Sequence, residues 1–483
     1  AEDAYNNTTT KDTDGSALTI TETVTFTSTA TASPSGDVPT YGGDDLTDGT
    51  TVSVDLTLGS FATDTIIMYD ALEVPTITIS HNPTGVSDAI TINPNVLDHF
   101  SWEPIGPQQA GAGFQVWIEA KDAYDNTTTK DVDGSALTPL EIVDFTSTAT
   151  ASPSGEAPRY GLDDLTDGTT VSVDLAAGVF LTDFITLYDS GETPTITITH
   201  DAMTGVTDSI TVDHNIPDYL QFIAQPTNTV AGESISPAMT IEIFDQYGNS
   251  CTSATDTITL SFENNAGGGT LSGTTGKAAS GGVGTFDDIS INRVAPGYTL
   301  RADAAGITGG ISDAFEITVR ELTGSGALAE SKVYDGTTDA GIDIGPAVLI
   351  GVMDLDDVTL DDRGNTSTFA DKNAGSDKPV TVSGLSITGA DASNYYLTQP
   401  TGLTADITAK ELTVTDTVAA DKVYNGSASI ALSGATLAGV VGGDTVSLIN
   451  DTVGTASQAT VGTDLAVSTT MSITGTDAGN YTC

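Results

Sequence analysis

The sequence contains few basic residues and no long hydrophobic run. Only 14 of 483 residues are Lys or Arg, against 66 Asp or Glu, so the formal net charge is -52. Phosphate contacts need Lys and Arg, so we expect no binding to nucleic acid and none to anionic membranes. No transmembrane run or signal peptide is visible, as in an exported mature chain or an internal fragment. We expect no membrane insertion, and cations are the natural partners of such a surface.

Cysteine is almost absent. Cys251 and Cys483 are too few for a disulfide scaffold. The four histidines are scattered along the chain, so a four-ligand zinc site with the cysteines is excluded. Cys251 and Cys483 could pair with each other or between chains, and the sequence leaves this disulfide open.

Short alternating segments argue against the disorder that high charge would otherwise suggest. Thr51–Leu56, Thr76–Ser80 and Thr240–Phe244 each alternate apolar with polar residues. This period of two is typical of antiparallel strands with one buried face. Gly and Asp-Gly pairs suit the turns between them. We therefore predict an all-β protein, built of antiparallel β-sandwich modules in an elongated rod and without amphipathic helices.

Internal repeats divide the chain into five predicted units. Tyr5–Leu18 recurs at Tyr124–Leu137, an offset of 119 residues. A different repeat follows, in which Lys332–Gly336 recurs at Lys422–Gly426, an offset of 90. We call the predicted units modules 1 to 5: 1–95, without its first strand; 96–214; 215–320, a divergent copy; 321–409; and 410–483, without its last strand.

Modules 1 to 3 share an Asp-x-Tyr-x-Asn stretch, at Asp3–Asn7, Asp122–Asn126 and Asp245–Asn249. Upstream strands such as Phe100–Trp102 and Leu220–Phe222 accompany it. With these residues the modules resemble bacterial immunoglobulin-like domains of the invasin and intimin type. The resemblance implies Ig-like sandwiches and says little about a ligand.

Modules 4 and 5 share Lys-Val-Tyr-Asp/Asn-Gly at Lys332–Gly336 and Lys422–Gly426. Each also has a Gly-x-Asp-x-x-Asn-Tyr segment, at Gly389–Tyr395 and Gly475–Tyr481. These modules resemble the YDG repeats of haemagglutinin-like bacterial surface adhesins. The second copy has Asn425 where the pattern has Asp, a change that keeps the turn chemistry.

The resemblances imply a location and a role. We predict a non-enzymatic structural subunit of an extracellular, prokaryotic cell-surface fibre or adhesin stalk. The strands missing from modules 1 and 5 mean either a fragment of a longer protein or head-to-tail strand complementation between subunits. The partner would then be a longer copy of the chain or a homopolymer. The alternatives are a module that binds a glycan or host-surface protein, and accessory repeats of a larger secreted enzyme.

The best candidate for a small-ion site is an Asp-x-Asp-Gly loop. Asp12 and Asp14 recur as Asp131 and Asp133. Calcium prefers carboxylate and carbonyl oxygens on a turning loop, so calcium is the predicted cofactor. The competing interpretation is an Asp-Gly turn that holds no ion.

Other polar and aromatic residues give weaker signals. His81 and His200 are equivalent by 119 residues and follow a strand, so we expect surface histidines at strand ends. No convergent partners for a catalytic or metal role are evident. Tyr41 and Tyr160 are candidates for exposed aromatics that contact a glycan, or else for core residues.

Overall fold

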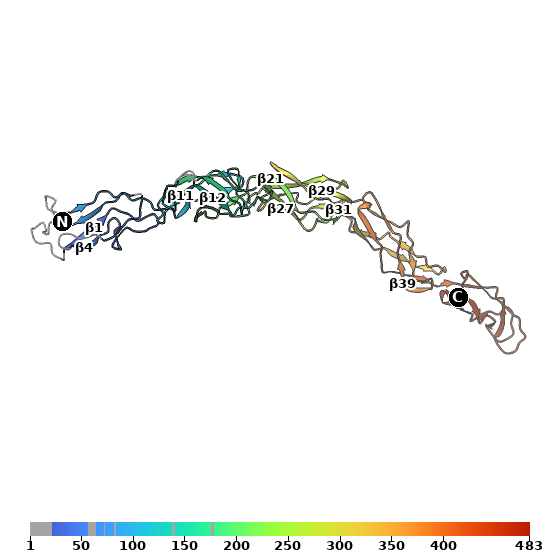
Figure 1. The fold of residues 1–483 in the computed structure, drawn as a ribbon. Coiled ribbons are helices and arrows are strands. Elements are labelled where there is room, and N and C mark those ends of the chain that lie inside the picture. Colours follow the sequence, from blue (N-terminus) through green and yellow to red (C-terminus); the bar gives the residue numbers. More distant parts are fainter. Residues whose placement is uncertain (1–21, 57–63, 72, 82–83, 138–140, 175–177) are drawn as a thin grey trace, which may run out of the picture.

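The described residues form a row of β-sheets along an elongated, bent rod (Figure 1). The computed structural model describes residues 22–56, 64–71, 73–81, 84–137, 141–174 and 178–483. Among them the only helices are two 3-10 turns, η1 (Ala392–Asn394) and η2 (Ala478–Asn480). The predicted all-β architecture is confirmed. No helix in these ranges is long and apolar enough to cross a membrane.

Modules 1 and 2 have matching sheets, as their repeat predicts. Phe26 faces Val52 in one sheet, and Phe145 faces Val171 in the other. Both Phe side chains are buried because alternate residues of a strand face the same side. The strands of module 1 are β1 (Glu22–Ser28), β2 (Thr40–Tyr41), β3 (Asp44–Asp45), β4 (Val52–Leu56), β5 (Ile66–Ile67), β6 (Ile77–Ser80) and β7 (Gly85–Val86), in sheets of order β4-β1-β6-β7 and β3-β2-β5.

The described part of module 2 contains counterparts of these two sheets and two further sheets, β16-β11-β8 and β20-β9. The sheet that corresponds to β4-β1-β6-β7 has the order β15-β12-β18-β19. The strands of module 2 are β8 (His99–Trp102), β9 (Gln108–Gln109), β10 (Gly113–Phe114), β11 (Trp117–Lys121), β12 (Ile142–Ser147), β13 (Arg159–Tyr160), β14 (Asp163–Asp164), β15 (Val171–Asp174), β16 (Val179–Leu181), β17 (Ile185–Thr186), β18 (Ile196–His200), β19 (Met203–Val206) and β20 (Val212–Asp213).

Module 3 has the longest strands, which form one extensive sheet system. Its main path is β22-β31-β29-β30-β21-β23-β27. Alternate residues of β23 are buried, as the Thr-Ile-Glu-Ile pattern predicts. The strands are β21 (Pro217–Ala224), β22 (Thr229–Val230), β23 (Met239–Asp245), β24 (Thr257–Asn264), β25 (Leu271–Ser272), β26 (Gly276–Ala278), β27 (Val283–Phe286), β28 (Ser290–Ile291), β29 (Ala295–Ala304), β30 (Ile307–Ile311) and β31 (Phe315–Thr318).

Module 4 consists of short strands in small sheets. Its largest sheet has the order β34-β42-β39-β38, so β42 lies between β34 and β39. The strands are β32 (Arg320–Ser325), β33 (Leu328–Glu330), β34 (Lys332–Val333), β35 (Gly341–Asp343), β36 (Val348–Ile350), β37 (Thr359–Asp361), β38 (Thr368–Phe369), β39 (Gly375–Thr381), β40 (Ser386–Thr388), β41 (Tyr395–Thr398) and β42 (Leu403–Thr408).

Module 5 repeats most of this arrangement with fewer buried residues. Its largest sheet has the order β45-β46-β49-β50. Its strands are β43 (Lys410–Glu411), β44 (Thr413–Thr415), β45 (Val418–Ala419), β46 (Ser429–Ser433), β47 (Thr436–Ala438), β48 (Ser447–Ile449), β49 (Val453–Ala456), β50 (Val467–Thr469), β51 (Ser472–Thr474) and β52 (Tyr481–Thr482).

The buried apolar side chains of the described residues form four clusters. Modules 1, 2 and 3 each have their own, around Phe26, Phe145 and Phe286. The fourth cluster contains buried residues of both module 4 and module 5, including Tyr334 and Tyr481. The last two modules therefore share apolar contacts across their boundary.

Candidate functional site

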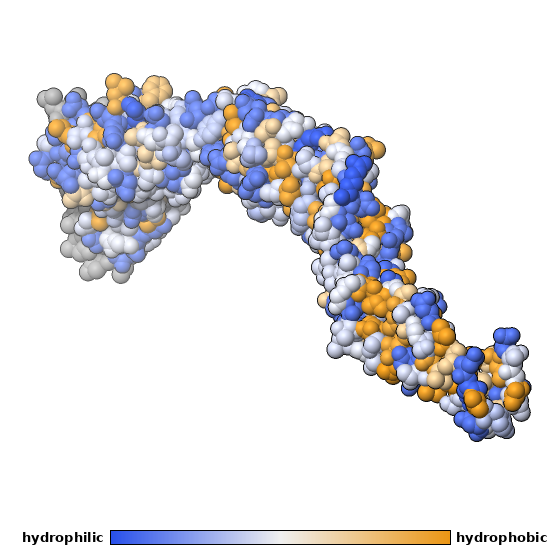
Figure 2. Space-filling view, turned by 90° about the vertical axis from the view of Figure 1, so that its right-hand side faces the viewer, coloured by the Kyte–Doolittle hydropathy of each residue, from blue (hydrophilic) through white to orange (hydrophobic). Residues whose placement is uncertain are grey.

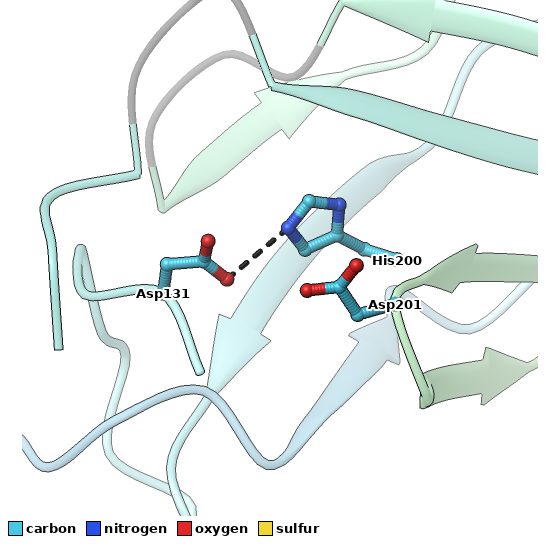
Figure 3. Close-up of side chains that lie close together, drawn as sticks. All are labelled: Asp131, His200 and Asp201. Atoms are coloured by element: carbon cyan, nitrogen blue, oxygen red, sulfur yellow. Dashed lines mark hydrogen bonds and ion pairs between the residues drawn. The ribbon is translucent and has the colours of Figure 1, made fainter. Parts of the chain in front are cut away.

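Asp131, His200 and Asp201 meet in module 2, where one potential metal-ligating atom of each lies within 4.8 Å of the others. His200 Nε2 lies 3.1 Å from an Asp131 carboxylate oxygen, and the three side chains converge from two parts of the chain (Figure 3). His200 and Asp131 are buried, with 7% and 8% of their surface exposed, whereas Asp201 is exposed.

Local backbone geometry places the three side chains. His200 is the last residue of β18, and Asp201 follows in the turn to β19 with a φ of 52°, a left-handed conformation that Asp tolerates. Asp131 begins a turn closed by the Asp131 N–H to Ser135 carbonyl bond of 2.8 Å. Gly134 in this turn has a φ of 85°. Tertiary packing then brings the two turns together.

The surroundings of His200 favour its charged form. Burial lowers the pKa of the imidazole, but the Ile142 carbonyl, the Asp131 carboxylate and the charge of Asp201 more than compensate, so the pKa is raised. His200 Nδ1 lies 2.9 Å from the Ile142 carbonyl oxygen and donates to it. The expectation that His200 is a surface histidine is therefore wrong, because an aspartate 69 residues away buries it.

The two aspartates of the predicted calcium loop point to different partners. Asp131 contacts His200, whereas Asp133 accepts a 2.8 Å bond from the Ser135 N–H. Hydrogen bonds from the Ser135 side chain and from its N–H lower the pKa of Asp133. The other predicted pair, Asp12 and Asp14, lies outside the described residues. Calcium binding at these loops stays a prediction.

Cys251 and Cys483 are both free thiols. Cys251 is fully buried in the core of module 3, and burial raises the pKa of its thiol to about 11. Cys483 is exposed on module 5. A disulfide that uses Cys251, within the chain or between chains, would require module 3 to open.

Tyr41 and Tyr160 are core residues and offer no exposed ring. They are only 5% and 6% exposed, and their hydroxyls accept bonds from the Asp64 and Asp183 N–H groups. Burial of the ring also raises the pKa of Tyr160.

A different aromatic surface lies on the sheet β16-β11-β8. There Trp102 and Trp117, the only two tryptophans of the chain, line a shallow groove of about 540 Å³ together with Glu103 and Glu119. The indole N–H of Trp102 is buried and has no hydrogen-bond partner among the residues that the structure describes, and Trp117 is 48% exposed. Sequence reasoning missed this groove because its residues come from separate strands.

The Asp-x-Tyr-x-Asn stretch of module 2 forms the joint to module 1. Asp122 accepts bonds from the N–H groups of Tyr124 (2.9 Å) and Asn126 (3.0 Å), which closes a tight loop. The Asn126 amide then reaches module 1. It donates to the Tyr69 carbonyl at 2.6 Å and accepts from the Ala71 N–H at 2.9 Å.

The stretch of module 3 forms the same joint to module 2. Asn249 donates to the Tyr188 carbonyl at 2.8 Å and accepts from the Ser190 N–H at 3.0 Å. Tyr188 and Ser190 correspond to Tyr69 and Ala71 of the first joint by the 119-residue offset. The two asparagines therefore bind equivalent backbone groups of the preceding module.

A pair of tyrosine rings packs beside each of these joints. The rings of Tyr188 and Tyr247 lie 5.0 Å apart at the joint of modules 2 and 3. Those of Tyr69 and Tyr124 lie 4.7 Å apart at the joint of modules 1 and 2. Both kinds of contact, an amide on backbone groups and a ring pair, thus recur at the two boundaries.

The joint between modules 4 and 5 is built around a carboxylate. Asp444 accepts bonds from the hydroxyls of Tyr334 (2.7 Å) and Tyr481 (2.6 Å), and it pairs with Lys372 at 3.1 Å. Hydrogen bonds from Tyr481 and Tyr334, with the bond from Lys372, lower the pKa of Asp444. Burial and the bond to Asp444 raise the pKa of Tyr481 to about 12.

Asparagines of the Gly-x-Asp-x-x-Asn-Tyr segments also cross joints. Asn480 accepts a 2.8 Å bond from the Ala374 N–H of module 4, and Asn394 accepts a 3.1 Å bond from the Val294 N–H of module 3. Every predicted module boundary is thus crossed by an asparagine side chain that binds backbone. These roles were missed in the sequence because the motifs signal only a domain class.

The YDG domain family matches residues 318–402 and 408–483. These two segments correspond to modules 4 and 5, and they make up about a third of the chain. No curated protein matches the chain.

Several solved structures are similar to the chain. FdeC, an Escherichia coli adhesin, is 16% identical over 65% of this chain and 99% of that one, with a TM-score of 0.31. Domains 4–9 of the surface layer protein SbsC are 16% identical over 97% and 74%, with a TM-score of 0.21. A β-glycosidase from Bacteroides vulgatus is 12% identical with a TM-score of 0.19, and the alignment covers 48% of this chain. The chain spans only 28% of the length of that glycosidase.

Proposed function

We propose that the chain is a non-enzymatic stalk segment of an extracellular prokaryotic surface adhesin or fibre, with Ig-like modules 1 to 3 followed by two YDG modules. The observation that carries this proposal is the recurrence of one joint at two boundaries. Asn126 and Asn249 bind equivalent backbone groups of the preceding module. A repeated joint sets the same angle between successive modules, which a spacer that projects a tip requires.

The acidic surface suits this role. A formal net charge of -52 keeps neighbouring rods apart and soluble. The mechanism is mechanical: backbone ladders within modules and side-chain bonds between them resist bending and extension.

Small-angle X-ray scattering of the whole chain tests the stalk proposal. The double variant N126A/N249A should retain its strand content by circular dichroism while its maximum dimension becomes shorter and more broadly distributed. A matched control is N265A, because Asn265 bonds only within an exposed turn of module 3. Rods that stay equally straight without both joint asparagines would contradict a stalk held by these joints.

We further propose that such segments assemble head to tail through a strand that enters module 5. In module 4 the groove between β34 and β39 is filled by β42. The counterparts in module 5 are Lys422–Val423 and β50, and within residues 410–483 no strand lies between them. A groove of about 630 Å³ lined by Tyr424, Val461 and Val467 takes its place.

Exposed apolar side chains support this step. Figure 2 shows hydrophobic residues on the surface toward the C-terminal end of the rod. Tyr424 is 63% exposed, whereas its counterpart Tyr334 is 1% exposed under Asp444 and Tyr481. Val423 and Val461 are 90% and 83% exposed. A strand from a second copy would cover them by β-augmentation.

A peptide with the sequence of residues 401–409 tests the assembly step. It should bind the chain one to one and protect Tyr424 from iodination, because it carries the alternating Leu-Thr-Ala-Asp-Ile-Thr of β42. A scrambled peptide of the same composition is the control. Filaments that persist when the 401–409 peptide saturates the chain, or failure of that peptide to bind, would contradict strand complementation at this groove.

Glycan binding is a second candidate function, favoured by the groove with Trp102 and Trp117. The exposed indole of Trp117 offers a stacking face, and the nearby carboxylates of Glu103 and Glu119 offer bonds to hydroxyls. The variant W117A should lose binding on a glycan array, whereas W117F should retain part of it. If the parent chain binds no glycan on the array, glycan binding is contradicted and the stalk role is the function that remains.

A further inference from the structure

The contact between His200 and Asp131 requires a proton or a metal ion between the two facing atoms. His200 Nδ1 donates its hydrogen to the Ile142 carbonyl at 2.9 Å. A neutral imidazole has only one N–H, so its Nε2 would face Asp131 with a lone pair. An ionised carboxylate also only accepts, and the two atoms lie 3.1 Å apart. Either a proton or a metal ion on Nε2 turns this repulsion into attraction.

Asp201 makes a metal ion the better fit. Its carboxylate completes a group of three ligand atoms within 4.8 Å of one another. Neighbouring ligands of a tetrahedral zinc ion lie about 3.3 Å apart, which follows from bond lengths of about 2.0–2.2 Å. The His200–Asp131 distance is close to this value, and Asp201 on its exposed turn can rotate to reach the same point.

We propose that Asp131, His200 and Asp201 bind a divalent transition-metal ion of the zinc type. Imidazole nitrogen with carboxylate oxygen suits zinc, whereas calcium prefers six to eight oxygen ligands. The bond from Nδ1 to the Ile142 carbonyl is the outer-shell contact that orients a metal-bound imidazole. Water completes the coordination on the side of Asp201, which is exposed.

The ion has a structural role in module 2. It ties the turn at Asp131 to the turn between β18 and β19, two segments separated by 69 residues. A cross-link of this kind stabilises the folded state by an amount that rises with the logarithm of the metal concentration above the Kd. In module 1 the repeat has His81 but Asn82 in place of Asp201. We therefore expect one strong site in each chain, in module 2.

Calorimetric titration of the chelator-treated full chain with Zn²⁺ at about pH 7.5, above the ordinary imidazole pKa of about 6.5, tests the proposal, and Zn²⁺ must displace any proton on His200 Nε2. The expected result is one-to-one binding that raises the melting temperature. H200Q should abolish the binding. D201N, which copies module 1 and keeps the turn, should weaken it by at least about tenfold, the loss seen even for outer-shell partners.

H99Q is the matched control and should bind as the parent does. His99 also lies between two carboxylates, but Asp98 contacts its Nδ1 and Asp125 its Nε2, so they cannot share one ion with it. If H200Q fails to fold, two other measurements test the metal site. They are the Zn²⁺ affinity of D201N, which changes only the exposed turn, and the visible spectrum of Co²⁺ bound to the parent chain. Absence of one-to-one binding, binding unchanged in both H200Q and D201N, or equal affinity for Ca²⁺ would overturn the proposal.

Discussion

The joints that connect modules 1 to 3 and the joint between modules 4 and 5 hold neighbouring modules together with different chemical groups. At the first two joints a neutral Asn amide binds backbone groups, and a pair of Tyr rings packs beside it. At the last joint the Asp444 carboxylate collects two Tyr hydroxyls and Lys372. An amide does not titrate whereas a carboxylate does, so the two ends of the rod should respond differently to mutation and to pH.

The largest effect should come from placing a charge in an amide joint. The substitution N249D keeps the size and shape of the side chain. It buries a second carboxylate next to the first, because Asn249 Nδ2 lies 2.9 Å from the Asp245 carboxylate. An uncompensated buried charge costs about 3 kcal/mol. Calorimetry should show module 3 unfolding earlier at neutral pH, with recovery as the new carboxyl is protonated.

N425D is the matched control for the same substitution. Asn425 is exposed on module 5, and the equivalent Asp335 of module 4 already pairs with Lys332 at 2.9 Å. The change should alter stability by less than about 0.5 kcal/mol. Equal losses in the free energy of unfolding for N249D and N425D would contradict the need for a neutral side chain at the joint.

The next largest effect should come from removal of the carboxylate joint. D444A deletes the acceptor for the Tyr334 and Tyr481 hydroxyls, and hydrogen bonds to a charged group contribute about 2 kcal/mol at a partly solvated site. Module 5 should unfold separately from module 4, as a new calorimetric transition. A single unchanged transition would show that the shared apolar cluster suffices.

Protonation of Asp444 at acid pH should weaken the carboxylate joint by no more than the loss of stability expected for D444A. The pKa of Asp444 is lowered in the folded chain, so its stabilisation is present above the unfolded value of about 3.9 and is lost as pH falls through the lower folded value. Scattering below about pH 4 should show the module 4–5 joint loosen first. D444N, which cannot titrate, should lack this step.

The smallest effect should come from the ring pairs. Y188L keeps the backbone carbonyl that Asn249 binds but removes the edge contact with Tyr247. The expected loss is about 0.5–1 kcal/mol, measured in a double-mutant cycle with Y247L. A coupling near zero would leave the Asn amide as the main contact of the joint.

Local pattern predicted much of the fold because the cause of each strand is local. The alternation in Thr240–Phe244 predicts which residues of β23 are buried, and the equal spacing of the first repeats predicts matching registers at Phe26 and Phe145. Asp-Gly at Asp133 predicts a turn, which the φ of Gly134 confirms. These are properties of one strand or one turn, and neighbouring residues decide them.

The candidate site could not be predicted in the same way. Asp131 lies in a turn and His200 is the last residue of β18, so their contact depends on how β12 and β18 pair. Nor does the sequence say whether Trp102 and Trp117 share a groove or whether Tyr41 faces the core. Such contacts join residues far apart in the chain.

The sequence by itself determined that this protein is an acidic, all-β chain of repeated modules, because composition, period and offset are written residue by residue. Only the tertiary structure decided that Asn126 and Asn249 bind the preceding module and that Asp131 contacts His200. It also decided that Tyr424 is exposed whereas its counterpart Tyr334 is buried. The physical reason is that packing between sheets and between modules sets which distant side chains meet.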